Sequence, residues 1–321
     1  MKLIAIGVKI GITGLLAWLL LQRVDLAAAG ALLRSEGGAA AFLLAIAVLM
    51  GQAVIAGART ACVIRLLGGR GSIGRGFALW MIGLLVSQSL ITFIAGDAAR
   101  LWQFIRLGYS RRVASSVIVL ERAVGLVVLL AMVLPGAPVL FAHAPPGAVR
   151  TGVTILTIVC AAGILTFVTS GFLGGVRGLL PARLRAHHLL EVAIDLASVA
   201  RHIAPSWKRG ASVVAASVLM QLSNVFAVFI LARASGINID LPATAAVALP
   251  SLLIAMMPVT VAGWGVREGA MIVGYGLFGV APATALAVSV AFGLAMLVAS
   301  LPGALFIRWG KEAKKPALSV N

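Results

Sequence analysis

Acidic residues are scarce in this chain. Its 321 residues include 9 aspartates and glutamates against 26 lysines and arginines, and charged residues make up only 11% of the total. Soluble domains are about a quarter charged, whereas here the mean hydropathy is +1.10. A composition this poor in charge excludes an ordinary soluble domain and predicts an all-α, polytopic transmembrane helical bundle.

Cysteine is almost absent as well. Cys62 and Cys160 are the only two, and both lie in or beside apolar runs, which argues against a disulfide framework and a CxxC metal site. The sequence also contains no HExxH, GxSxG, Walker or paired-carboxylate motif. We therefore expect no catalytic residue, no metal site and no cofactor.

Long apolar runs are abundant, and a helical span needs about 20 of such residues. We predict about six to eight spans, with candidates at 4–21, 39–58, 113–134, 152–172, 211–231 and 282–307. Two further apolar stretches, 76–95 and 242–258, are harder to place. The whole chain, 1–321, is predicted to be one integral membrane domain, with an amphipathic surface segment at 179–209 and a basic tail at 308–321.

The net charge of +17 is concentrated beside the apolar runs, as the positive-inside rule predicts. This placement favours anionic lipid and excludes nucleic acid as a partner, because no soluble domain presents the basic residues. It also predicts a multi-pass membrane protein with both termini in the cytoplasm. Two clusters flank the stretch 76–95, the first at Arg59, Arg65, Arg70 and Arg75 and the second at Arg100, Arg106, Arg111 and Arg112.

The two clusters constrain the stretch between them. If 76–95 crossed the bilayer once, they would lie on opposite faces, against the positive-inside rule. A re-entrant helical hairpin resolves this conflict, with Ser87, Gln88 and Ser89 near its tip. A second re-entrant pair, at 242–258 and 269–280, is predicted from the other face, and two short crossings are the alternative. Two such interrupted segments are typical of inverted-repeat transporters, although the sequence similarity between them is weak.

Asp97 and Arg100 are costly residues for a membrane chain, since a charge at mid-bilayer costs about 2.5–3.5 kcal/mol on insertion scales. Three positions apart on a helix, they share a face. The functional interpretation is that Arg100 meets an anionic headgroup while Asp97 orients it. The alternative is that Asp97 caps the start of a helix.

Glu121 and Arg122 lie about 12 Å into the helix expected from Val113. Neighbouring residues on a helix point to different faces, so each needs a partner elsewhere, and the candidates are Asp97, Arg100, Arg267 and Glu268. A substrate role and simple charge neutralisation are both compatible with this position.

The string Gly263-Trp264-Gly265-Val266-Arg267-Glu268 follows an apolar run that ends at Pro258. The glycines predict a break, with a helix restarting near Val266 whose first amides and Arg267 form a site for phosphate or carboxylate. Trp264 is either an interfacial anchor or part of the substrate site. We expect a secondary polar lining of the site from Gln88, Gln221 and Asn224, for which helix-to-helix hydrogen bonding is the alternative.

Three features in this order resemble the lysylphosphatidylglycerol synthase transmembrane region family, also called flippase-like or UPF0104. They are Gly96-Asp97-x-x-Arg100, the helix with Glu121-Arg122 and Gly125, and Pro258…Gly263-x-Gly265-Val266-Arg267-Glu268. The family's usual GGD reads Ala95-Gly96-Asp97 here, and an extra residue separates Pro258 from Gly263. The resemblance covers nearly the whole chain and implies a lipid-translocating domain.

The sequence thus predicts a lipid flippase or transporter that moves an anionic or amphipathic phospholipid between leaflets. The residues expected to bind the substrate are Asp97, Arg100, Glu121, Arg122, Trp264, Arg267 and Glu268. The alternative is an enzyme, or a subunit of an enzyme, for lipid or polyprenyl-phosphate glycosyl transfer or hopanoid modification. Expected partners are membrane lipids, with a homo-oligomer or a lipid-modifying enzyme as further possibilities.

Overall fold

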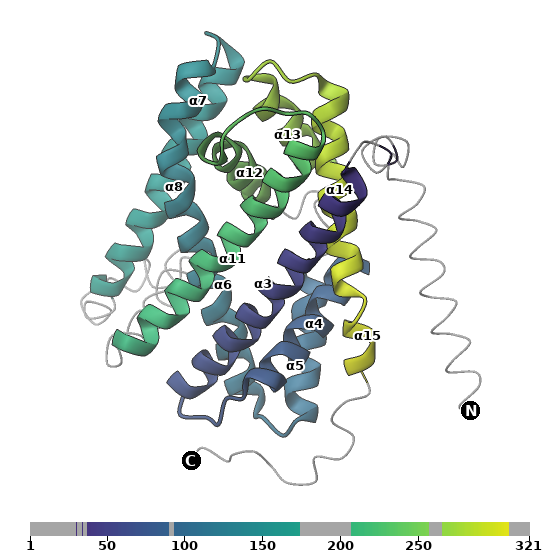
Figure 1. The fold of residues 1–321 in the computed structure, drawn as a ribbon. Coiled ribbons are helices and arrows are strands. Elements are labelled where there is room, and N and C mark those ends of the chain that lie inside the picture. The colour runs from purple at the N-terminus through teal and green to yellow at the C-terminus, as the bar shows by residue number, and fades with distance from the viewer. Residues whose placement is uncertain are drawn as a thin grey trace. The chain divides into compact units, whose positions relative to one another are not determined.

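The computed structural model describes residues 30, 34, 37–89, 93–173, 207–256 and 265–307, and this part of the chain folds into helices (Figure 1). In the first half, α3 spans Gly38–Leu66, α4 Ile73–Ser89, α5 Phe93–Arg106 and α6 Arg111–Val133; a 3₁₀ turn (Leu134–Gly136), α7 (Ala137–His143) and α8 (Ala148–Leu173) follow. The second half contains α11 (Trp207–Ala234), α12 (Leu241–Ala255), α13 (Val266–Gly276), α14 (Pro282–Ser300) and α15 (Gly303–Phe306).

Five helical segments of the described chain are long and apolar enough to cross a membrane, and two shorter apolar helices accompany them. The five are Gly38–Leu66, Arg111–His143, Ala148–Thr169, Lys208–Ala234 and Pro282–Phe306. They coincide with five of the six predicted long runs, so the predicted helical bundle is confirmed. Three predicted segments lie outside the described residues: the sixth run, 4–21; residues 179–206 of the surface segment 179–209; and the tail 308–321.

Local sequence explains where several helices begin and bend. The Ser110 hydroxyl accepts from the backbone N–H of Val113 at the start of α6, and Asp240 does the same for Ala243 at the start of α12. Pro135 lies in the 3₁₀ turn that separates α6 from α7, as expected of a residue without a backbone donor.

The helices group into two compact units, which we describe separately. Within the described residues, unit 1 comprises 37–51, 81–89, 93–100, 223–256 and 265–307, and unit 2 comprises 52–80, 101–173 and 207–222. In unit 1, α13 packs against both α12 and α14. In unit 2, α6 packs against α8, and its apolar core includes Ile64, Leu79, Phe104, Val117 and Val213. The prediction of a single domain stays a prediction.

A helical hairpin occupies the stretch 73–106. A side-chain Cβ at Gly96 would lie 1.9 Å from Ser87 Oγ, and one at Gly83 would lie 2.5 Å from Arg100 Cδ. These two contact pairs are centred on the same point near residue 91, so α4 and α5 run antiparallel. Glycine lets the two helices approach closely, as small residues do at helix interfaces in membranes.

Both ends of this hairpin lie at the same end of unit 2. The Tyr109 hydroxyl donates to the Arg70 carbonyl over 3.3 Å, which joins the α5–α6 turn to the α3–α4 turn. The stretch 76–95 is therefore part of a helical hairpin, as predicted, whereas its re-entrant character stays a prediction. With 17 and 14 residues, its arms are about 25 and 21 Å long at 1.5 Å per residue. Both are shorter than the roughly 30 Å hydrocarbon core.

A second hairpin is formed by α12 and α13. A Cβ at Gly274 would lie 2.7 Å from Val247 Cγ1, and these two positions are equally distant in sequence from the segment 257–264, which lies outside the described residues. The 15 and 11 residues of α12 and α13 correspond to about 22 and 16 Å. The predicted pair of short helices is therefore present. Its re-entrant character and the inverted repeat stay predictions.

Candidate functional site: two buried ionic clusters

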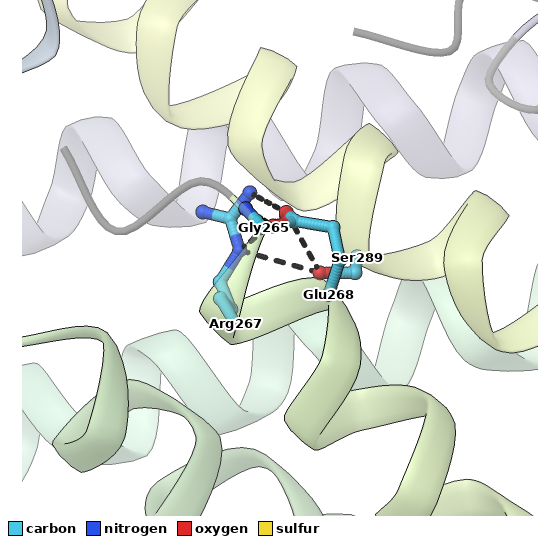
Figure 2. Close-up of polar contacts among 4 residues, drawn as sticks. All are labelled: Gly265, Arg267, Glu268 and Ser289. Atoms are coloured by element: carbon cyan, nitrogen blue, oxygen red, sulfur yellow. Dashed lines mark hydrogen bonds and ion pairs between the residues drawn. The ribbon is translucent and has the colours of Figure 1, made fainter. Parts of the chain in front are cut away.

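The first cluster is built at the start of α13 in unit 1, and we call it the Arg267 cluster: Gly265, Arg267, Glu268 and Ser289 (Figure 2). The helix restarts at Val266 as predicted. Gly265 precedes it with φ of +90°, a conformation that is strained for any residue with a side chain. The backbone N–H of Gly265 donates to Glu268 Oε2, which is the glutamate half of a capping box.

The other Glu268 oxygen holds the guanidinium. Arg267 Nη2 lies 2.6 Å from Glu268 Oε1 and Arg267 Nε lies 3.2 Å from it. Ser289, on α14, donates to the same oxygen over 3.2 Å and accepts from Arg267 Nε over 3.3 Å. Arg267 and Glu268 pair although they are adjacent in sequence, because both lie in the first turn of α13, where no preceding helical turn separates their side chains. Both side chains are buried.

An aromatic ring completes the surroundings of Arg267. The guanidinium carbon lies 5.7 Å from the centroid of the Phe292 ring on α14, within the range of a cation–π contact. At the N-terminus of α13, the Gly265 N–H and the Arg267 guanidinium both bind the chain's own Glu268 carboxylate. The anion site predicted there stays a prediction.

The second cluster lies in unit 2 and draws on three helices; we call it the Arg59 cluster: Arg59, Thr60, Glu121 and Ser217. The Thr60 hydroxyl donates to Glu121 Oε1 over 2.5 Å, and Arg59 Nε lies 3.9 Å from the same oxygen. Arg59 Nη1 donates to Ser217 Oγ over 3.1 Å. The guanidinium carbon of Arg59 lies 5.5 Å from the centroid of the Trp80 ring.

Burial makes the Arg59 cluster costly to disrupt. The exposed fractions are 6% for Arg59, 0% for Thr60 and 1% each for Glu121 and Ser217. A charge in such surroundings needs a partner, since removing one member of a buried pair costs about 3–5 kcal/mol. The sequence alone groups Arg59 with the basic residues that flank the apolar runs, and the structure buries it within α3, whereas Arg65, Arg70 and Arg75 are exposed.

The remaining predicted residues differ in burial. Arg100 is 4% exposed and Gln88 7% exposed, while Asp97, Gln221 and Asn224 are partly buried. Asp97 lies a full turn inside α5, so the alternative that it caps a helix start is wrong.

Arg122, unlike its neighbour Glu121, is exposed on α6. It lies on the same face as the exposed residues Val119 and Leu126. Trp264 lies outside the described residues. The convergence of the predicted residues in one cavity stays a prediction.

Sequence reasoning missed Thr60, Ser217 and Ser289 and misassigned Arg59. The three hydroxyl residues lie in apolar helices, where serine and threonine usually bond their own backbone. Ser217 does donate to the Val213 carbonyl over 2.9 Å. A usable signal existed for Arg59, because it lies within the continuous apolar helix α3 and not in the turn that follows it.

Membrane-length helices, two helical hairpins and buried ionic clusters define a multi-pass membrane protein with polar sites among apolar helices. The chain belongs to the lysylphosphatidylglycerol synthase TM region family, whose model matches residues 4–303. Membership confirms the resemblance seen in the sequence and identifies a membrane protein of a lipid-related family. Neither the curated proteins nor the solved structures gave a match.

Proposed function

We propose that the protein is a flippase-like transporter that moves an anionic phospholipid between the leaflets of a bacterial inner membrane. The observation that carries the proposal is the Arg267 cluster, a buried guanidinium held at a helix start by an internal carboxylate. A lipid phosphate has the same charge and oxygen geometry that arginine binds in a carboxylate. The match of residues 4–303 to a lipid-related membrane family also supports a lipid substrate.

The proposed mechanism is an exchange of anions on Arg267. The headgroup phosphate replaces the Glu268 carboxylate on the guanidinium, and Glu268 retains the Gly265 N–H and the Ser289 hydroxyl. When the lipid leaves, Glu268 returns. Arg267 is then paired at every stage, which avoids the penalty of an uncompensated buried charge. This also explains why a transporter of anions keeps an acid beside its cation.

The hairpins are the proposed pathway. Each is a pair of short helices, and unusually short apolar segments in the two halves of a transporter are typical of its binding site. Asp97 and Arg100 lie on one hairpin and Arg267 and Glu268 on the other. We propose that they serve the same lipid, with the basic α3–α4 and α5–α6 turns facing the cytoplasm.

A leaflet assay tests the proposal. Purified protein is reconstituted in liposomes with a fluorescent phosphatidylglycerol, and an impermeant quencher reports the lipid that changes leaflet. We expect Arg267→Gln and Asp97→Asn to lower the rate at least tenfold, with Arg267→Lys keeping part of it. Arg150→Gln, a change of an exposed arginine at the start of α8, is the matched control. Wild-type rates in the Arg267 and Asp97 variants would contradict the proposal.

A further inference from the structure

The two turns that are joined by Tyr109 and Arg70 present an exposed surface of unusual composition in unit 2. We call it the basic end: Arg70, Arg75, Trp102, Arg106, Arg111 and Arg112. No aspartate or glutamate occurs in 61–75 or in 101–112. Arg70, Arg75, Arg111 and Arg112 are exposed, and the structure gives them no ion pair within its described residues. These four arginines therefore place positive charge on the surface of unit 2 that no carboxylate of the described residues pairs with.

Trp102 and Arg106 add an aromatic contact to this surface. Trp102 is 50% exposed, and the guanidinium carbon of Arg106, one turn later on α5, lies 4.4 Å from the centroid of its ring. Ile73 and Ile105, 49% and 39% exposed, flank the arginines. Exposed apolar groups interleaved with arginines are typical of the boundary between headgroups and acyl chains, where tryptophan is also enriched.

The position of the basic end along the helices agrees with that boundary. It lies where α3 ends and α6 begins, and both belong to candidate membrane spans. The Tyr109 hydroxyl bond holds the two turns together, and Ser110 fixes the start of α6, so Arg111 and Arg112 project from a defined helix start. Arg65 stabilises the first turn by donating to the Gly71 carbonyl over 2.8 and 3.0 Å.

We propose that the basic end is a binding site for headgroup phosphates of anionic phospholipids at the membrane surface. It is separate from the buried Arg267 cluster and does not depend on transport. Arginine binds phosphate through paired N–H donors, and Trp102 and Ile105 contact the glycerol and upper acyl region. Anionic lipid is the occupant that the surface fits best, because charge, exposed apolar groups and position at the end of two spans all match it.

The test measures lipid retained by the full-length protein. Native mass spectrometry from mixed micelles with phosphatidylglycerol or phosphatidylcholine counts bound lipid as the lipid is titrated. We expect phosphatidylglycerol to bind in preference to phosphatidylcholine. The triple change Arg106→Gln, Arg111→Gln and Arg112→Gln is expected to weaken that binding about 100-fold, which corresponds to roughly fivefold per arginine. The same three positions changed to lysine keep most of it.

Matched variants separate lipid binding from folding. Arg150→Gln, at the other end of the α6–α7 run, is expected to leave phosphatidylglycerol binding unchanged, and Arg112→Gln alone to weaken it about fivefold. If the triple glutamine protein does not fold, the single change and the lysine protein carry the test. Equal binding of phosphatidylglycerol by wild type, Arg112→Gln and the triple variant would overturn the proposal, as would equal binding of the two lipids. A failure to detect transport, with phosphatidylglycerol still bound as expected, would contradict only the proposed function and not the lipid site at the basic end.

Discussion

The Arg267 cluster and the Arg59 cluster contain the same chemical groups, assembled in different ways. Each has an arginine, a glutamate, a serine hydroxyl and an aromatic ring near the guanidinium. In the Arg267 cluster the arginine and the glutamate are neighbours in the first turn of one helix. In the Arg59 cluster they come from α3 and α6, with the serine from α11.

This difference in assembly indicates a difference in role. The Arg59 cluster joins three helices of unit 2, so its contacts contribute directly to the packing of that unit. The Arg267 cluster includes Gly265, which is exposed, and the backbone amide of Gly265 also binds the Glu268 carboxylate. We infer that the Arg59 cluster is mainly structural and that the Arg267 cluster is the one in which partners exchange.

Removal of a glutamate carboxylate is expected to have the largest effect on stability and so to distinguish the two clusters most clearly. Glu121→Ala leaves Arg59 buried beside Ser217 and Trp80, and is expected to destabilise the protein by about 3–5 kcal/mol. Glu268→Ala is expected to cost less, because Arg267 is in the first turn of its helix, close in sequence to exposed Gly265. Thermal unfolding in detergent measures both. A larger loss for Glu268→Ala would reverse the assignment of roles.

A matched glycine pair tests the local geometry of each cluster. Gly265→Ala places a side chain at φ of +90° and is expected to cost about 1–3 kcal/mol, with transport impaired as well. Gly125 on α6 borders the other cluster, and a Cβ there would lie 3.5 Å from Arg59 Nη1, an ordinary contact. Gly125→Ala is therefore expected to change unfolding temperature little. Equal effects of the two changes would contradict the local account.

Loss of a single hydroxyl is the smallest expected effect. Ser217→Ala and Ser289→Ala each remove one hydrogen-bond acceptor of a buried arginine, worth about 0.5–1.5 kcal/mol of stability. Their effects on transport should differ, since only Ser289 touches the carboxylate that exchanges. The leaflet assay is expected to show slower transport for Ser289→Ala and an unchanged rate for Ser217→Ala. The opposite order would indicate that the Arg59 cluster contacts the lipid.

The comparison of the two clusters also explains which parts of the fold and of the candidate site were predictable from the sequence. The helical bundle follows from apolar runs, and the α4–α5 hairpin follows from basic clusters at 59–75 and 100–112 on a common face. The α13 start was predictable because glycine, arginine and glutamate stand together in the sequence. Glu121 was found because it is ionic, but its partners on α3 were not.

Tertiary packing explains the failures. Whether Arg59 is buried or exposed depends on how α3 packs against α6 and α11. The sequence pattern of α3 alone does not reveal that packing. Ser217 and Ser289 look like ordinary helix serines until a guanidinium is placed beside them. Arg122 is exposed whereas Glu121 is buried, because adjacent helix residues face different directions, as expected from the sequence.

The exchange of anions on Arg267 is tested most directly by the affinity of the purified protein for a phospholipid anion. A short-chain phosphatidylglycerol is titrated by calorimetry in detergent against wild type, Glu268→Gln, Arg267→Gln and Arg150→Gln. All four proteins also carry the triple glutamine change of the basic end, so that the measured heat reports lipid binding at the Arg267 cluster. We predict that Glu268→Gln binds about tenfold more tightly, because a charge-assisted bond to the competing carboxylate, worth about 1.5 kcal/mol, is gone, and that Arg267→Gln does not bind. Unchanged or weaker binding by Glu268→Gln would contradict the account.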